Sequence, residues 1–321
     1  MRILITGGTG FIGKYLMDRL GREHEIALFA LPWEKVASPT ARVFRGDLTS
    51  LETLTEAASW PEAVIHAGGL TRALKSSQFY RVNFDGTRHL IEALKVHNPN
   101  LKRFIFFSSL MAGGKPPSVE HPLVETQAPN PLGAYGRSKR LAEDYLAQSG
   151  IPYTTLRLPS VYGAGTVEYV DIFSFAKKGF APRLGAGEKY FSLIQVADVA
   201  EGVSRVLAEP ACSGHTYYLT DPRVYTWTEV QAVISALFPG RLRRLLIPKI
   251  LVYLTAFFYE AIALFTRRAP VLSIEKLGTL LHPFLVCDGR KFHRQFPDFK
   301  FSDMPKGMRE MYEDNLSKGL L

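Results

Sequence analysis

A tyrosine and a lysine stand four residues apart in the segment Tyr135-Gly-Arg-Ser-Lys139. On a helix this spacing places both side chains on one face. A phenol ordinarily titrates near pH ~10, and a neighbouring ammonium favours the phenolate, so Lys139 would bring Tyr135 closer to a working general acid and base. The same spacing is also common on solvated helix faces, so the pair alone leaves both interpretations open.

Two serines, Ser108 and Ser109, follow an apolar run that predicts a strand. A hydroxyl here could polarise the reacting oxygen of a substrate to which Tyr135 transfers a proton. Hydroxyls at such a place also cap strand-to-loop turns, and we would favour that role if Tyr135 and Lys139 were absent. The three residue types together favour proton transfer at a hydroxyl or carbonyl oxygen.

A glycine-rich segment, Thr6-Gly-Gly-Thr-Gly-Phe-Ile-Gly13, directly follows the first predicted strand and opens a helix. It fits G-x-x-G-x-x-G from Gly7 and G-x-G-x-x-G from Gly8. Glycines allow a tight turn and let backbone N–H groups approach a pyrophosphate, while the helix N-terminus adds partial positive charge. The position between strand and helix predicts a dinucleotide site.

The second predicted strand ends in Leu28-Phe-Ala-Leu-Pro32. It lacks both the acidic residue that binds the ribose of NAD and the arginine that accepts the 2′-phosphate of NADP. No carboxylate would repel that phosphate, and Lys35 or Arg45 could reach it. We therefore expect NAD(P) as cofactor, with a lean towards NADP.

The first half of the chain alternates short β-branched or aromatic runs with longer helical patterns, which predicts βαβ units and a parallel sheet. We predict strands over 2–6, 25–29, 42–44, 63–66, 103–108 and 153–158, and helices over 11–20, 50–58, 76–97 and 133–149. The fold class is α/β, a Rossmann-type doubly wound parallel sheet over 1–160. A smaller C-terminal α/β substrate-binding lobe takes up most of 161–321, with some segments returning to the Rossmann core.

The composition is that of an ordinary globular protein, with 321 residues of which 46% are hydrophobic and 21% charged. Two cysteines, Cys212 and Cys287, exclude a disulfide framework, and with no secretory leader expected a cytoplasmic location fits. The net charge of +9 suits nucleotide phosphates or anionic lipid, but no nucleic-acid motif occurs. The histidines lack metal-ligand spacing, so no metal is expected. The sequence does not decide the oligomeric state, and a homodimer is compatible with it.

Separated motifs carry a resemblance to a known superfamily. They are GGTGFIG at 7–13, RGDL at 45–48, HAGG at 66–69, VNFDGT at 82–87, FFSS at 106–109, YGRSK at 135–139, LRLPSVYG at 156–163 and VADVAEG at 196–202. In this order and spacing the chain resembles the extended short-chain dehydrogenases/reductases, the NAD-dependent epimerase/dehydratase family, over about residues 1–235.

The resemblance implies roles for individual residues. Ser109, Tyr135 and Lys139 match the catalytic set, in which the lysine also holds a ribose hydroxyl and the tyrosine borders the cofactor. Asn83 would belong to the supporting polar network. The implied cofactor contacts are Gly7, Gly10, Phe11, Ile12, Gly13, Asp47, Leu48, Ala67, Gly68, Pro159 and Val161.

Departures from the family pattern bear on the substrate. Leu110 and Met111 stand where sugar-nucleotide dehydratases carry an acid pair, so dehydration is not expected. Ser160 and Phe191 stand where many sugar-nucleotide epimerases carry an asparagine and a diphosphate-binding arginine. Both differences count against an anionic sugar nucleotide as substrate.

The segment 247–265 is strongly apolar and carries only Lys249 and Glu260 as charges. Three readings compete: a buried or capping helix of the substrate lobe, an interfacial helix on a membrane, and a membrane span. Arginines flank the segment and suit an anionic surface. They are Arg241, Arg243, Arg244, Arg267 and Arg268.

This segment, with 269–271 and a predicted helix over 274–281, loosely resembles the C-terminal part of the 3β-hydroxysteroid dehydrogenase group. We therefore expect an NAD(P)-dependent oxidoreductase that transfers hydride between nicotinamide and a hydrophobic, steroid- or lipid-like secondary alcohol or ketone. A nucleotide-sugar epimerase with tightly bound NAD and a non-catalytic NAD(P)-binding subunit are the alternatives. Peripheral membrane contact through 247–265 is left open.

Overall fold

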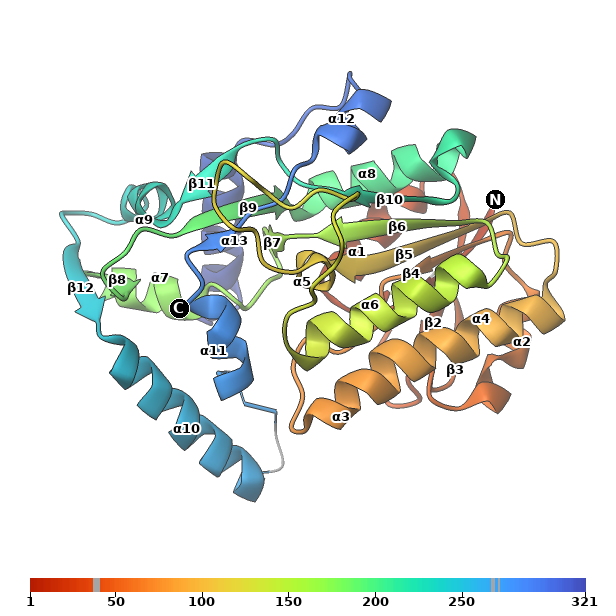
Figure 1. Ribbon diagram of the computed structural model, residues 1–321, viewed down its shortest axis with the longest axis horizontal. Coiled ribbons are helices and arrows are strands. Elements are labelled where there is room, and N and C mark those ends of the chain that lie inside the picture. Colours follow the sequence, from red (N-terminus) through yellow and green to blue (C-terminus); the bar gives the residue numbers. More distant parts are fainter. Residues whose placement is uncertain (37–40, 267–268, 271) are drawn as a thin grey trace.

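The computed structural model describes residues 1–36, 41–266, 269–270 and 272–321 (Figure 1). Arg267, Arg268 and Val271, on which part of the expectation for the C-terminal segment depends, lie outside the described residues.

A parallel sheet of seven strands forms the centre of the protein, in the order β10-β6-β5-β4-β1-β2-β3. β2 and β3 follow β1 on one side of the sheet. β4 lies on the other side of β1, and β5, β6 and β10 follow it in that direction. Such a reversal places a ligand outside the carboxyl ends of the two central strands, here β1 and β4. The strands are β1 (Arg2–Thr6), β2 (Glu25–Ala30), β3 (Arg42–Arg45), β4 (Ala63–His66), β5 (Arg103–Ser109), β6 (Tyr153–Leu158) and β10 (His215–Tyr218).

Helices cover both faces of this sheet (Figure 1). Ile3 and Ile5 of β1 join one core, which contains side chains of α1 (Phe11–Leu20), α8 (Val196–Ala208) and α12 (Arg290–Gln295). Leu4, whose side chain points to the opposite face, joins the second core with α2 (Thr55–Ser59), α4 (Gly86–His97) and α6 (Gly133–Gln148). The predicted doubly wound α/β fold is confirmed.

The helix predicted over 76–97 is interrupted. The chain forms α3 (Ser76–Phe79), a π-helical turn (Tyr80–Asp85) and then α4. A π turn is wider than an α turn and often occurs at functional sites. Here it carries the buried Asn83. The helix predicted over 50–58 likewise begins as a 3₁₀ turn (Leu51–Leu54) before α2.

The C-terminal part forms two small sheets beside the large one. β9 (Tyr190–Gln195) pairs with β7 (Ser160–Tyr162), β11 (Val224–Thr226) and β13 (Phe284–Leu285), and β8 (Phe180–Leu184) pairs with β12 (Arg243–Ile247). A separate core holds this part together, with Tyr162, Phe173, Tyr225, Met308 and Met311 fully buried. Its helices are α7 (Val170–Lys177), α9 (Trp227–Ser235) and α13 (Met304–Ser317).

Two further helices, α10 (Lys249–Thr266) and α11 (Ile274–Leu280), project from this part of the molecule (Figure 1). Among the described side chains of α10, only Val252, Ala256 and Ala263 are buried. Of the reading as a buried or capping helix, the buried form is wrong, because most of the described large side chains face outward, whereas a helix that caps the lobe by packing on α11 agrees with the structure. No helix within the described residues has the length and apolar character needed to cross a membrane.

Candidate active site

The loop between β1 and α1 brings backbone segments unusually close together. Gly7 has φ +71°, and a Cβ on Gly7 would lie 2.7 Å from the backbone nitrogen of Gly68. A Cβ on Gly13 would lie 2.3 Å from the carbonyl oxygen of Gly7. At the N-terminus of α1, no described side chain forms a capping hydrogen bond, and no acidic residue occupies the first turn. The free N–H groups and the helix dipole at this cradle fit the pyrophosphate of a dinucleotide.

Buried hydrogen bonds connect the carboxyl ends of β1 and β4. The backbone N–H of Gly68 donates to Thr6 Oγ1 (3.0 Å), and Thr6 Oγ1 lies 2.6 Å from His66 Nδ1. His66 Nε2 lies 2.9 Å from Thr87 Oγ1, which donates to the carbonyl oxygen of Asn83 (2.6 Å). Burial, reinforced by the charge of Lys139, lowers the pKa of His66 to about 3. His66 is therefore a neutral ring whose hydrogen bonds order the glycine loop.

The remaining predicted cofactor residues surround this edge of the sheet. Phe11 and Ile12 begin α1 after Gly10, the backbone N–H of Ala67 donates to the carbonyl of Thr6 (3.2 Å), and Pro159 and Val161 are half-buried at the start of β7. After β3, the Asp47 carboxylate accepts from the N–H of Thr49 (2.8 Å). The side chain of Leu48 packs beside Gly86.

The end of β2 carries charges of both signs. Arg45 donates to the carbonyl oxygens of Leu31 (2.9 Å) and Glu34 (2.6 Å), and the Glu34 carboxylate accepts from the N–H of Leu31 (3.0 Å). Glu34 was not predicted as a cofactor residue, because it lies four residues beyond the end of β2 rather than directly after the strand. A carboxylate favours ribose hydroxyls and an arginine favours a 2′-phosphate, so the lean towards NADP stays a prediction.

Ser109 ends β5, and its hydroxyl lies close enough to Tyr135 to lower the pKa of that phenol. Its hydroxyl oxygen also accepts from the N–H of Met111 (3.2 Å), which caps the short helix α5 (Leu110–Gly113). Ser108 Oγ, by contrast, is buried and has no hydrogen-bond partner among the described residues. This geometry favours Ser109 over Ser108 as the serine that acts with the tyrosine.

Tyr135 is half-buried, and its ring packs edge-on against Phe79 with 5.8 Å between centroids. Burial raises the pKa of Tyr135 to about 12, the hydrogen bond with Ser109 opposes this shift, and the carboxylate of Glu168 adds to it. The expected lowering of this pKa by Lys139 is contradicted. The Lys139 ammonium donates to the carbonyl oxygen of Phe107 (2.8 Å), and burial lowers the pKa of Lys139 to about 8 against the effect of Glu143.

Hydrogen bonds of the Asn83 side chain connect the loop after β4 to the helix that carries Tyr135. Its amide accepts from the N–H of Leu70 (2.7 Å) and donates to the Leu70 carbonyl (3.0 Å) and to Ser138 Oγ (3.2 Å). Ser138 in turn donates to the carbonyl oxygen of Tyr135 (2.8 Å). A Cβ on the neighbouring Gly69 would lie 3.3 Å from Lys139 Nζ. The cofactor loop and the catalytic helix are thereby held at close range.

A second set of polar residues lies near the tyrosine, and of these the sequence had pointed only to Ser160. The hydroxyl of Ser160 lowers the pKa of Tyr169, and the carboxylate of Glu168 raises the pKa of both Tyr135 and Tyr169. Glu168 also lies 3.8 Å from the guanidinium of Arg72 in the loop after β4. Arg72, Glu168 and Tyr169 come from loop segments without periodicity or a recognisable motif, so only the fold brings them to the tyrosine.

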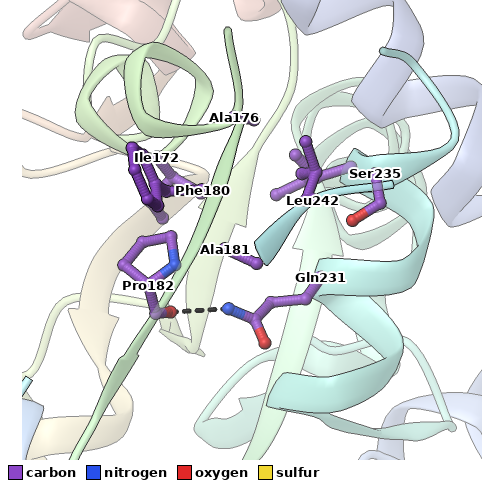
Figure 2. A pocket seen from close by; sticks show the side chains of 9 residues that line it. Ile172, Ala176, Phe180, Ala181, Pro182, Gln231, Ser235 and Leu242 are labelled. Atoms are coloured by element: carbon purple, nitrogen blue, oxygen red, sulfur yellow. Dashed lines mark hydrogen bonds between the residues drawn. The ribbon is translucent and has the colours of Figure 1, made fainter. Parts of the chain in front are cut away.

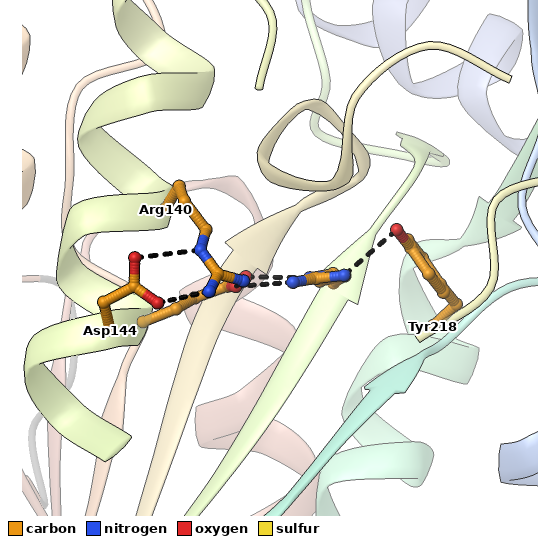
Figure 3. A network of polar contacts seen from close by, with 5 residues as sticks. Arg140, Asp144 and Tyr218 are labelled. Carbon is orange, nitrogen blue, oxygen red and sulfur yellow. Dashed lines mark hydrogen bonds and ion pairs between the residues drawn. The ribbon is translucent and has the colours of Figure 1, made fainter. Parts of the chain in front are cut away.

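A buried ionic network anchors the catalytic helix α6 to the sheet (Figure 3). Arg157 of β6 donates to both carboxylate oxygens of Glu143, from Nε (3.0 Å) and from Nη2 (2.7 Å), and to the hydroxyl of Tyr218 (3.2 Å). On the outer side, Arg140 pairs with Asp144 (Figure 3). Glu143 lies one turn from Lys139, so the network fixes the helix at the place where the ammonium sits.

The residues that follow Ser109 are apolar. Leu110 is buried and Met111 packs in the same cluster, together with Leu123 and Leu285. Farther out, Phe191 packs edge-on against Trp227 with 6.1 Å between ring centroids. Apolar side chains thus occupy the positions of the dehydratase acid pair and of the epimerase arginine.

A small cavity of about 10 Å³ lies elsewhere, between α7, β8 and α9 (Figure 2). Gln231 donates to the carbonyl oxygen of Pro182 at its edge (2.5 Å). Its lining is mostly apolar and contains none of the predicted site residues. A volume of this size is about that of one water molecule, so it is no substrate site.

Comparisons with known proteins agree with this geometry. The profile described as the NAD dependent epimerase/dehydratase family matches residues 3–219. The chain is 27% identical over 286 residues to a ceramide reductase of Caulobacter vibrioides, covering 87% of this chain and 84% of that protein. It is 29% identical over 236 residues to a 4-hydroxy-2-methyl-3-oxo-4-farnesyl-3,4-dihydroquinoline-1-oxide ketoreductase of Stigmatella aurantiaca, covering 69% and 68%.

Among solved structures, the UDP-glucose 4-epimerase of Thermotoga maritima with UDP-glucose superposes with a TM-score of 0.79 over 100% of both chains at 22% identity. At this level of identity the likeness concerns the fold.

Proposed function

This chain belongs to the NAD-dependent epimerase/dehydratase family of extended short-chain enzymes, and from that premise we propose that it reduces a hydrophobic ketone, or oxidises the corresponding secondary alcohol, with NAD(P). The observation that carries the proposal is the position of Ser109 beside Tyr135, whose pKa the Ser109 hydroxyl lowers, next to an apolar wall. Leu110 and Met111 form this wall where an elimination reaction would need acids.

The chemistry of the site follows from these side chains. When bound, the nicotinamide supplies or accepts the hydride at the substrate carbon. Ser109 and Tyr135 hydrogen-bond the substrate oxygen, and in the reductive direction the phenol gives its proton to that oxygen as the carbon–oxygen double bond becomes single. A phenol with a pKa of about 12 is protonated at neutral pH, which suits a proton donor. Lys139 would hold a ribose hydroxyl.

Two observations favour an apolar substrate over a sugar nucleotide. Lys189, the cation beside Phe191, donates to the carbonyl oxygen of Leu280 (2.6 Å) and is buried, so it is engaged away from a diphosphate. Two of the relatives are named as reductases, one of ceramide and one of a farnesyl-bearing dihydroquinoline oxide. Both named substrates carry long hydrocarbon chains. A lipid-like ketone is the substrate class that fits both observations.

The test is oxidation of NADH or NADPH by the purified chain with long-chain ketones, followed by absorbance. Tyr135→Phe should lower the rate by about 10² to 10⁴, the usual contribution of a general acid. Tyr145→Phe, on the same helix with its hydroxyl on Glu92 at the surface, is the matched control and should keep the wild-type rate. Full activity of Tyr135→Phe would overturn the assignment, and the ratio of rates with the two cofactors would decide between NAD and NADP.

The second candidate function is epimerisation of a nucleotide sugar, favoured by relatives named UDP-glucose 4-epimerase that are 29% and 32% identical over 52% and 51% of this chain. Such an enzyme retains NAD through its cycle and shows no net redox change. Recovery of bound NAD with the purified protein, together with epimer formation from a UDP-sugar and a flat absorbance trace with ketones, would favour it. The third candidate, a non-catalytic NAD(P)-binding subunit, predicts neither activity.

A further inference from the structure

Helix α10 presents an apolar surface that nothing in the described part of the chain covers. Its buried stripe, Val252, Ala256 and Ala263, packs towards α11, where Leu277 is the buried partner. The other large side chains face outward, from Tyr259 at 43% exposed to Phe265 at 89%. They are Ile250, Leu251, Tyr253, Leu254, Phe257, Phe258, Tyr259, Ile262 and Phe265, and Leu246 of β12 continues the surface. We call this set the α10 surface.

The threonines and the acidic residue of α10 form hydrogen bonds within the protein. Thr255 donates to the carbonyl of Leu251 (2.8 Å) and Thr266 to that of Ile262 (3.1 Å). Glu260, the acidic residue of the helix, accepts from the backbone N–H of Ile274 (2.8 Å) and so binds towards α11. The α10 surface therefore carries no outward carboxylate. Its exposed hydroxyls belong to Tyr253 and Tyr259, and tyrosine suits a membrane–water interface because its ring is apolar and its hydroxyl can stay in water.

Cations gather at one end of this surface. Arg241, Arg243, Arg244 and Lys249 are exposed on β12, just before it and at the start of α10. None of the four forms an ion pair with a described residue, although many other arginines of the protein do. An apolar helix face with unpaired cations beside it matches the physical pattern of interfacial membrane helices.

We propose that the α10 surface docks on an anionic lipid bilayer, with α10 lying in the interface and the four cations at the headgroup phosphates. A second copy of the chain suits this surface less well. Parallel symmetric pairing would bring like cations towards each other, and antiparallel pairing would leave them without a carboxylate partner on the surface, in a protein of net charge +9. Anionic headgroups provide that compensation directly.

α10 is connected through α11 to the helix that carries the proposed catalytic residues. α10 packs on α11, and α11 contacts α6, the helix of Tyr135 and Lys139 (Figure 1). A bilayer bound at the α10 surface would therefore lie on the side of the lobe that borders the catalytic helix. This is the side from which a lipid-like substrate of the proposed reaction would arrive, but the docking itself does not depend on that reaction.

The test is flotation of the purified full chain with two kinds of vesicle, pure phosphatidylcholine and phosphatidylcholine with 30% phosphatidylglycerol. We expect binding to the anionic vesicles at low salt and release at high salt. Arg243→Gln with Arg244→Gln should weaken it about 30-fold, because each cation near the surface contributes about fivefold. Phe257→Glu with Phe258→Glu should abolish it. Val96→Glu, on α4 with 71% of Val96 exposed, is the matched control and should bind like wild type.

Equal flotation of all variants, or none by the wild type, would overturn the proposal. A dimer in light scattering that Phe258→Glu dissociates, without vesicle binding, would assign the surface to a second copy instead. Unfolding midpoints of the variants equal to that of wild type exclude a folding defect. Turnover of a short, water-soluble ketone is measured in parallel, so that failure of the proposed reaction and failure of docking give different results.

Discussion

Glu143→Gln tests whether the buried network behind α6 holds the catalytic helix in place. Glu143 and Arg157 are 5% and 3% exposed, and the pair is bidentate. Glutamine keeps one acceptor oxygen. Its amide nitrogen would stand in place of Oε2, which now lies 2.7 Å from Arg157 Nη2, so two N–H donors would face each other. Removing one partner of a buried pair leaves the other charge uncompensated, which costs about 3–5 kcal/mol.

We expect the free energy of unfolding of Glu143→Gln, measured by urea denaturation, to fall by about 3 kcal/mol, the lower part of that range, because one hydrogen bond survives. Glu23→Gln is the control, since Glu23 pairs with Arg19 at the surface with 58% of its side chain exposed, and it should change stability by about 0–1 kcal/mol. Replacing both partners, as in Glu143→Leu with Arg157→Met, should recover most of the loss.

A second measurement separates positioning from stability. Glu143 raises the pKa of Lys139 against the effect of burial, so Glu143→Gln should lower that pKa further below about 8. The pH profile of cofactor binding should shift in the same direction, while that of Glu23→Gln should not move. A loss of stability no larger than that of the control, with an unchanged pH profile, would refute the reasoning.

Three further predictions concern the cofactor edge. Gly13→Ala should abolish NADH binding in a fluorescence titration, because its Cβ would lie 2.3 Å from a backbone oxygen, whereas Gly187→Ala, with open space around it, should bind normally. Between about pH 8 and 10.5 the unfolded chain binds a proton at Lys139 that the folded chain does not, so stability should rise across this window and Lys139→Met should remove the rise. Between about pH 3 and 6.5 the unfolded chain likewise binds a proton at His66 that the folded chain does not. The free energy of unfolding should therefore fall by about 3 kcal/mol from pH 7 to pH 4, and this loss should be smaller in His66→Gln.

The parts of the fold that follow from local pattern could be predicted from the sequence. The strands of the large sheet in the first half and helix α1 lie within a residue of their predicted bounds, because buried parallel strands and helices each leave a clear periodicity. The π turn at 80–85 could not be predicted. It depends on Asn83 reaching the backbone of Leu70, a contact between segments with no local signature.

The candidate site likewise has a part that the sequence predicts and a part that only the packing determines. The glycine loop and the Tyr135–Lys139 spacing can be recognised in the sequence. The pKa values and hydrogen-bond partners of Tyr135 and Lys139 depend on the packing around them. The predicted direction of the Tyr135 pKa shift was wrong because burial and the carboxylate of Glu168 raise this pKa, while the Lys139 ammonium binds the carbonyl oxygen of Phe107. Glu168 enters the site from a distant loop, so no spacing in the sequence could have indicated it.

The hydrogen bonds around His66 admit only one direction of donation. They begin at an N–H of Gly68, which can only donate, and end at the carbonyl of Asn83, which can only accept. The Thr87 hydroxyl donates its single hydrogen to the Asn83 carbonyl, so it must accept from His66, and the ring carries its hydrogen on Nε2. The Thr6 hydroxyl then donates to Nδ1. Two consequences follow. The Gly68 N–H is already committed to Thr6, so a bound pyrophosphate must take its backbone hydrogen bonds from the start of α1. Protonation of Nδ1 would make Thr6 Oγ1 an acceptor from the ring as well as from Gly68, so the Thr6 hydroxyl hydrogen would lose its partner at the edge where the cofactor binds.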